Sequence, residues 1–182
     1  QAGGFAGLAA LAGGIGDPAV RNRGTIGGSL ANNDPAACYP SAALATGATI
    51  VTNTREIAAD DFFQGLFETA LDEGEIITAV RMPIPEASNY QKFEQPASRF
   101  ALVGVFVAKY ASGVRVAVTG ASEGGVFRGS EAEAALGANF SADSVSGLSV
   151  AADDMIEDLH GSKAYRAHLV KVMTDRAVAA SG

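Results

Sequence analysis

The 182-residue chain is 48% hydrophobic and has a formal net charge of −7, without a cluster of lysine or arginine. This size suits one large domain or two small ones with a real core, and the acidic balance argues against a nucleic-acid partner, which would need a basic face. No apolar run approaches the ~20 residues of a membrane span, and the single cysteine excludes an internal disulfide framework.

Several kinds of catalytic site are also disfavoured. The two histidines, His160 and His168, and the one cysteine have no spacing typical of a zinc site. The sequence has neither a Walker loop nor the glycine pattern of a Rossmann dinucleotide site. The first residues lack the features of a signal peptide, and one cysteine fits a reducing compartment, so we expect a cytoplasmic protein. Any redox chemistry would need a bound cofactor.

The first elements in chain order surround a glycine-rich segment. An alanine-rich apolar stretch predicts a short helix at residues 5–15, and Asp17-Pro18 predicts a turn. Residues 20–34 then join three glycines to two small hydroxyl residues, Thr25 and Ser29. Glycine lets a ligand approach the main chain closely, and hydroxyl groups beside free amides suit an anion such as a diphosphate. From glycine content alone, a plain turn before a helix is the simpler interpretation.

The rest of the first half alternates short helices and strands. Asp34-Pro35 can cap a helical turn, and a second run begins at Pro40. β-Branched residues predict strands. We expect helices at 41–46 and, as one turn, at 60–63, and strands at 48–52, 55–58 and 74–82.

The segment 83–89, with two prolines and several polar residues, is the best domain boundary. Beyond it the pattern predicts a strand at 90–95, then a three-stranded antiparallel sheet and a helical bundle. The three strands are expected at 101–110, 114–119 and 126–128, and the helices at 131–136, 142–147 and 162–179. In the last helix we expect Tyr165, Leu169, Val172 and Arg176 to share one face.

Two stretches resemble a known family. VRNRGTIGGSLANNDPAA at residues 20–37 resembles the second flavin-binding loop of the FAD subunit of molybdenum hydroxylases, the medium subunits of carbon monoxide dehydrogenases and xanthine dehydrogenases. YRAHLVKVMTDRA at 165–177 resembles the final helix of that family. Flavin oxidases of the vanillyl-alcohol type share the general domain plan, but the C-terminal stretch resembles the hydroxylases instead.

The resemblance implies where FAD would be held. The TIGGS-type segment lies against the diphosphate and ribityl chain in the family, and a lysine or arginine often lies near the flavin at the position of Lys92. Arg21, Asn22 and Arg23 are expected to hold the glycine segment through hydrogen bonds to its carbonyls. The cofactor contacts expected from the resemblance are Thr25, Ile26, Gly27, Gly28, Ser29, Asn32, Asp34 and Lys92.

One residue departs from the family pattern. Many relatives have an acidic residue after Pro-Ala-Ala, where this chain has Cys38. That acidic side chain often holds the ribityl chain or the ring of the flavin, and a thiol is a poor replacement for a carboxylate acceptor. We therefore leave Cys38 outside the expected contacts.

The resemblance also implies the fold class, α+β. Residues 1–85 would be the second half of a PCMH-type FAD-binding domain, and residues 86–182 the C-terminal domain of the carbon monoxide dehydrogenase flavoprotein. Relatives have an earlier glycine loop before this point, on the other side of the diphosphate. Without those donors, each worth ~1.5–3 kcal/mol when charge-assisted, we expect this chain alone to bind FAD weakly or not at all.

The function implied is an oxidoreductase subunit without catalytic side chains or a metal of its own. FAD would pass electrons from the [2Fe–2S] clusters of a small subunit, which receive them from the molybdenum cofactor of a large subunit, to an external acceptor. Carbon monoxide, purines, aldehydes and N-heterocycles are all compatible substrates of the whole enzyme. The alternative is a flavin-free interaction module that bridges the other two subunits.

Overall fold

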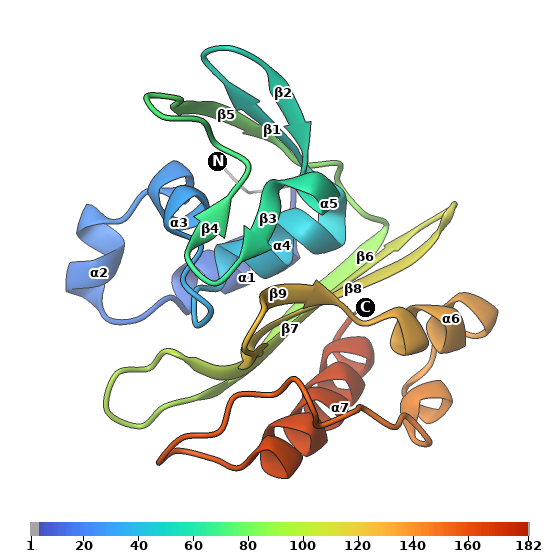
Figure 1. Cartoon of the computed structure of the whole chain (residues 1–182). Coiled ribbons are helices and arrows are strands. Elements are labelled where there is room, and N and C mark those ends of the chain that lie inside the picture. Colours follow the sequence, from blue (N-terminus) through green and yellow to red (C-terminus); the bar gives the residue numbers. More distant parts are fainter. Residues whose placement is uncertain (1–3, 182) are drawn as a thin grey trace.

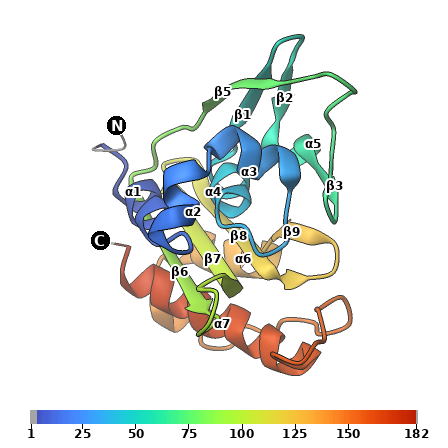
Figure 2. The same cartoon turned by 90° about the vertical axis from the view of Figure 1, so that its left-hand side faces the viewer.

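The computed structural model describes residues 4–181. Its largest sheet is antiparallel and has four strands in the order β6-β7-β8-β9 (Figure 1). A second, three-stranded sheet in the order β2-β1-β5 lies at the top of Figures 1 and 2, away from the C-terminal helix. The large sheet consists of β6 (Ala87–Glu94), β7 (Ala101–Tyr110), β8 (Gly113–Ser122) and β9 (Gly125–Arg128).

Both faces of the large sheet are covered, which explains the almost continuous apolar sequence of β7. Val103, Val105 and Val107 pack on one side, against helix α7 (Lys163–Ala179). Phe106 and Ala108 point to the other side, because successive side chains of a strand alternate between faces. Helices α6 (Ser130–Ala138) and η1 (Ala142–Val145) share the α7 side, and α1 (Ala6–Gly13) and α4 (Tyr39–Thr46) cover the opposite side.

The smaller sheet and the remaining helices come from the first half of the chain. β1 pairs with both β2 and β5, and a two-residue turn joins β3 to β4. These elements are α2 (Pro18–Arg23), α3 (Ile26–Asn32), β1 (Thr49–Thr52), β2 (Glu56–Ala58), α5 (Ala59–Phe62), β3 (Phe63–Gly65), β4 (Glu68–Thr69) and β5 (Ile77–Arg81).

The predicted three-stranded sheet was wrong, because residues 87–94 pair with β7 along its length and add a fourth strand. The glycine-rich segment was expected as a loop, whereas two short helices, α2 and α3, occupy most of it. Asp17 and Thr25 cap them: the Asp17 carboxylate accepts from the amide of Val20 at 2.9 Å, and the Thr25 hydroxyl from that of Gly28 at 3.0 Å.

The last helix is confirmed as α7, but the face with Tyr165, Leu169, Val172 and Arg176 is only partly buried. Leu169 is buried, but Tyr165 and Arg176 are exposed. The buried stripe is rotated towards Arg166, Val170 and Met173. Arg166 joins this stripe because its guanidinium finds buried acceptors, which a reading of hydrophobic spacing does not detect.

The two domains expected at 1–85 and 86–182 meet in one of the hydrophobic clusters of the fold. Phe5, Leu11 and Ala42 from the first part pack with Tyr90 and Phe106 from the second. The domain division itself stays a prediction.

An ion-pair network adds a second connection between the two parts. Asp60 binds Arg115 at 2.7 Å and Arg128 at 2.8 Å. Although burial opposes ionisation, the two guanidinium groups lower the pKa of Asp60. Asp60 belongs to α5, in the first part, and the two arginines belong to β8 and β9, so the network ties the small sheet region to the large sheet.

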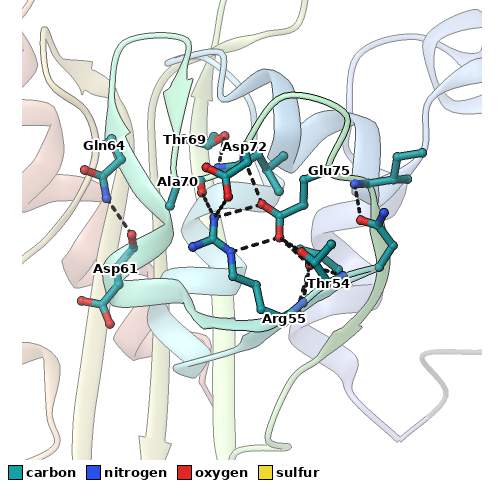
Figure 3. A network of polar contacts seen from close by, with 12 residues as sticks. Thr54, Arg55, Asp61, Gln64, Thr69, Ala70, Asp72 and Glu75 are labelled. Atoms are coloured by element: carbon teal, nitrogen blue, oxygen red, sulfur yellow. Dashed lines mark hydrogen bonds and ion pairs between the residues drawn. The ribbon is translucent and has the colours of Figure 1, made fainter.

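The turn regions beside the small sheet are held by a buried carboxylate (Figure 3). The Glu75 side chain is 2% exposed and accepts hydrogen bonds from the hydroxyls of Thr52 and Thr54, from the amide of Asp72, and from Arg55. Hydrogen bonds from Arg55 and Thr52 hold the pKa of Glu75 well below its usual range.

Glu75 should make the stability of the fold sensitive to acid. The pKa of Glu75 is lower in the folded chain than the value of about 4.3 expected in the unfolded chain. The contribution of Glu75 to the free energy of unfolding is therefore complete above about pH 4.3 and is lost as the pH falls further. We expect Glu75→Gln to lower the melting temperature at pH 7 and to flatten its dependence on pH below about 4.3. Glu73→Gln, at an exposed neighbour, is the control; equal pH profiles for the two variants would contradict this account.

Candidate functional site

The main pocket has a volume of about 390 Å³ and opens beside the glycine-rich segment. The end of α1, the helices α2 and α3, and residues 34–39 form most of its wall. Lys92 of β6 and Phe100 of the β6–β7 loop complete it from the second half of the chain. Its volume lies in the range of roughly 300–1,000 Å³ that is typical of small-molecule sites.

The backbone of the glycine-rich segment is only partly satisfied within the fold. Gly24 donates its amide to the carbonyl of Val20 at 2.8 Å, and Ser29 donates to that of Thr25 at 3.0 Å. Ile26 and Gly27 begin α3 and therefore lack acceptors within the helix. Neither amide donates to another of the residues 4–181, so both can bond to a ligand or to solvent.

The structure separates the eight expected FAD contacts into two groups. Four of them line the pocket: Thr25, Ser29, Asp34 and Lys92. The other four do not: Ile26, Gly27, Gly28 and Asn32. The helical turn explains the division, since residues four apart share a face. All eight stay predictions as cofactor contacts.

The second group has identifiable positions in the fold. Ile26 packs in the core between α3 and the small sheet, and Asn32 is exposed. A Cβ atom at Gly27 would meet Ile77 at an ordinary 3.7 Å, whereas one at Gly28 would lie 3.0 Å from the Thr25 hydroxyl. A side chain at Gly28 would therefore disturb the helix cap.

The buried ammonium of Lys92 joins the two sides of the pocket. The Lys92 side chain is 6% exposed, and its Nζ donates to the carbonyls of Gly14 at 2.6 Å and of Arg99 at 2.8 Å. The carboxylate of Glu94 lies 3.4 Å from Nζ and forms an ion pair with it, and the Glu94 side chain is about half exposed. Arg21 acts similarly on the other wall, although its partners are the carbonyls of Ile15 and Gly16 rather than those of the glycine segment.

Cys38 lies in the pocket wall next to Tyr90. The thiol is 5% exposed, and burial raises its pKa. The Tyr90 hydroxyl lies beside the thiol, is buried, and has no hydrogen bond of ordinary geometry among residues 4–181. Burial and the neighbouring Cys38 hold the pKa of Tyr90 well above its usual value. Both groups are therefore neutral at pH 7.

The large sheet supports the pocket wall from behind. The Thr119 hydroxyl donates to the carbonyls of Pro35 and Ala37, and the amide of Gly120 donates to Pro35 at 2.6 Å. Ala36 and Ala37 line the pocket. The second half of the chain thus fixes the segment that follows the glycine-rich helix.

Sequence reasoning missed Asn33, a buried residue in the left-handed region with φ of 43°. Its side-chain nitrogen donates to the backbone carbonyls of Gly65 at 2.7 Å and Glu68 at 3.0 Å, and its backbone carbonyl accepts from the amide of Phe67. Asn33 therefore holds the β3–β4 turn against the end of α3. Asparagine after a helix is a known C-terminal signal, so its conformation was accessible from the sequence, but these long-range partners were not.

Comparisons with known proteins find a family and several relatives that this chain is similar to. Residues 2–85 match the family described as the FAD binding domain in molybdopterin dehydrogenase. The glyceraldehyde dehydrogenase medium chain of Sulfolobus acidocaldarius is 34% identical in an alignment that covers 90% of this chain and 63% of the relative. The nicotine 6-hydroxylase medium subunit of Paenarthrobacter nicotinovorans is 36% identical, over 92% of this chain and 64% of the relative.

Residues 2–85 match the FAD-binding domain family, and over most of its length the chain is similar to the FAD-binding medium subunits of molybdenum hydroxylases.

Solved structures of the family share the fold. Carbon monoxide dehydrogenase from Hydrogenophaga pseudoflava matches with a TM-score of 0.79 at 32% identity, over 92% of this chain and 63% of that one. Quinoline 2-oxidoreductase from Pseudomonas putida 86 matches with a TM-score of 0.81 at 26% identity, over 96% of this chain and 66% of that one. The chain thus spans a little under two thirds of the length of these relatives.

Two features are absent from residues 4–181. None of the helices in this part of the chain combines the length and apolar character needed to cross a bilayer. The same residues contain no group of three or more histidine, cysteine, aspartate or glutamate side chains placed to hold a metal ion.

The residues of the pocket suit part of a flavin dinucleotide. Small side chains at Ala12, Gly16, Gly24 and Ala36 leave the main chain accessible. Hydroxyl groups of Thr25 and Ser29 and the cations of the wall offer donors to phosphate and ribityl oxygens.

Proposed function

We propose that this chain is the FAD-binding, electron-transfer subunit of a molybdenum hydroxylase. Its partners would be a large subunit with the molybdenum cofactor and a small subunit with [2Fe–2S] clusters, and FAD would deliver electrons to an external acceptor. Residues 86–182 would form the C-terminal domain of the family. The absence of a disulfide pair fits a reducing cytoplasm.

One observation carries the proposal: Thr25 and Ser29 of the family's flavin motif form one pocket with Lys92, which is distant in the sequence. A bound flavin would supply the redox chemistry, as cofactors do in general. Thr25 and Ser29 would orient it through their hydroxyl groups. Lys92 would place a positive charge at the pocket wall, and Phe100 would keep water from that side.

Filling the pocket should abolish FAD binding. Ser29 lines the pocket on α3, so Ser29→Leu adds volume inside it and removes a hydroxyl donor. Loss of one charge-assisted hydrogen bond of about 1.5–3 kcal/mol corresponds to roughly 10- to 100-fold in affinity, and the added volume should increase this loss. Quenching of flavin fluorescence during titration of the assembled complex measures this loss of affinity.

The matched control is Ala31→Leu, which adds an apolar side chain at an exposed position of the same helix. This variant should keep the affinity for FAD within about twofold of the wild-type value, because surface substitutions usually change the free energy by less than about 0.5 kcal/mol. A wild-type complex that holds its partner subunits but no FAD would contradict the proposal and favour the flavin-free interaction module.

A further inference from the structure

The ammonium group of Lys92 links the β6–β7 loop, residues 95–100, to the first half of the chain. Its Nζ donates to the carbonyl of Arg99 in this loop at 2.8 Å and to that of Gly14, at the end of α1, at 2.6 Å. Among the residues that the structure describes, the other hydrogen bonds of the loop are internal to it. Lys92 is therefore the hydrogen-bonded connection between this loop and α1.

The backbone of the loop depends on such a contact. Arg99 has φ of 60°, a left-handed conformation that a residue other than glycine keeps only where its surroundings fix it. Residues 96–100 are exposed, so packing contributes little to holding the loop. The bond from Lys92 to the Arg99 carbonyl acts at the strained position itself.

The same bond sets the position of the pocket wall. Phe100, the neighbour of Arg99, lines the pocket although it is 45% exposed. Ile15 and Gly16 follow Gly14 and line the pocket as well. One ammonium group thus ties together two parts of the wall that are distant in the sequence.

The ammonium group has little left to offer a ligand directly. Of its three N–H donors, the two carbonyls take two, and the carboxylate of Glu94, 3.4 Å from Nζ, pairs with its charge. The Lys92 side chain is also only 6% exposed. An effect of Lys92 on a bound ligand should therefore come mainly through the loop that it holds.

We propose that Lys92 is a positioning residue, a clamp that holds the β6–β7 loop and Phe100 against the pocket and so slows the release of FAD. The inference rests on the proposed function and gives Lys92 a role in retaining the cofactor. Release requires no unfolding of the sheet. Once the bond to the Arg99 carbonyl breaks, the exposed loop is free to move away from the pocket.

A double-mutant cycle on the assembled complex tests this role, with the fluorescence of released FAD reporting its dissociation rate constant. Lys92→Met should raise this rate constant by roughly 10- to 100-fold, the factor that corresponds to one lost charge-assisted hydrogen bond. Phe100→Ala removes the wall itself and should raise it by a similar factor. Because Lys92 acts through Phe100, the double variant should release FAD within about twofold of the faster single variant.

Phe93→Ala is the control for the loss of an aromatic side chain next to Lys92. Phe93 points to the opposite face of the sheet, where its ring packs edge-on against Tyr165 of α7 with the centroids 6.2 Å apart. This variant should keep the FAD dissociation rate within about twofold of the wild-type value. Its effect should simply multiply with that of Lys92→Met.

Effects of Lys92→Met and Phe100→Ala that multiply in the double variant would overturn the clamp and leave the proposed function intact. If Lys92→Met fails to assemble, Phe100→Ala still decides, because an unchanged FAD dissociation rate in this variant would also overturn the clamp. A wild-type complex that assembles without FAD would contradict both the clamp and the proposed function.

Discussion

Arg166→Met is expected to destabilise the chain by about 3 kcal/mol or more, the size typical of breaking a buried charged network. The Arg166 side chain is 3% exposed, and its guanidinium donates to the carbonyls of Leu102 and Gly120, each at 2.8 Å, and to Asp158 at 2.7 Å. Methionine fills similar space, but it leaves two buried carbonyls without a donor. For a chain of this length the melting temperature should fall by about 6–12 °C.

Arg176→Met is the matched control because Arg176 is exposed on the same helix. This variant should change the melting temperature by no more than about 2 °C, since surface substitutions usually stay within ±0.5 kcal/mol. Differential scanning calorimetry of the two variants and the wild type makes the comparison. Similar melting temperatures for both variants would show that the Arg166 network contributes little to stability.

The strands were the most predictable part of the fold. Ala101–Tyr110 is a continuous apolar run bounded by turn residues, and the structure confirms it as β7 over the same residues. The pairing of Ala87–Glu94 with β7 was not predicted, because its alternation of polar and apolar residues indicates a strand but not its neighbour. The helices in the glycine-rich segment were missed since glycine normally opposes helix formation, whereas the Thr25 cap stabilises α3 here.

Half of the expected contacts in the candidate site line the pocket, and the reason for the division is geometric. A motif gives residues in sequence order, but α3 presents only Thr25 and Ser29 to the pocket. Lys92 was predicted from family resemblance, not from spacing. Phe100 and the Tyr90–Cys38 contact carried no sequence signal, because both depend on how β6 and β7 pack against the first half of the chain.

The contacts of Arg166 connect the last helix to the pocket wall. Arg166 donates to the carbonyl of Gly120, and the amide of Gly120 donates to the carbonyl of Pro35. Pro35 precedes the two alanines that line the pocket. Gly120 lies at the irregularity in pairing between β8 and β9, where it turns the strand so that its carbonyl and amide reach opposite sides of the sheet.

The conformation and surroundings of Gly120 make this position sensitive to substitution. Its φ is +79°, in the region that favours glycine, and a Cβ atom there would lie 2.6 Å from the carbonyl oxygen of Ala101 and 2.7 Å from that of Leu102. Backbone oxygens of a central strand cannot move aside as a flexible side chain can. We expect Gly120→Ala to cost about 3–5 kcal/mol, the sum of backbone strain and overpacking, and to weaken FAD binding by the intact complex.

Gly74→Ala separates the two causes. Gly74 has nearly the same φ, +78°, but a Cβ atom there has no neighbour within 4 Å among the described residues. It should therefore cost only the strain of the left-handed conformation, about 1–2 kcal/mol, and leave FAD affinity unchanged. Urea unfolding of both variants, with flavin titration in parallel, measures the difference. Equal losses would mean that strain alone accounts for Gly120, and unchanged FAD affinity in folded Gly120→Ala would show that its bond to Pro35 does not shape the pocket.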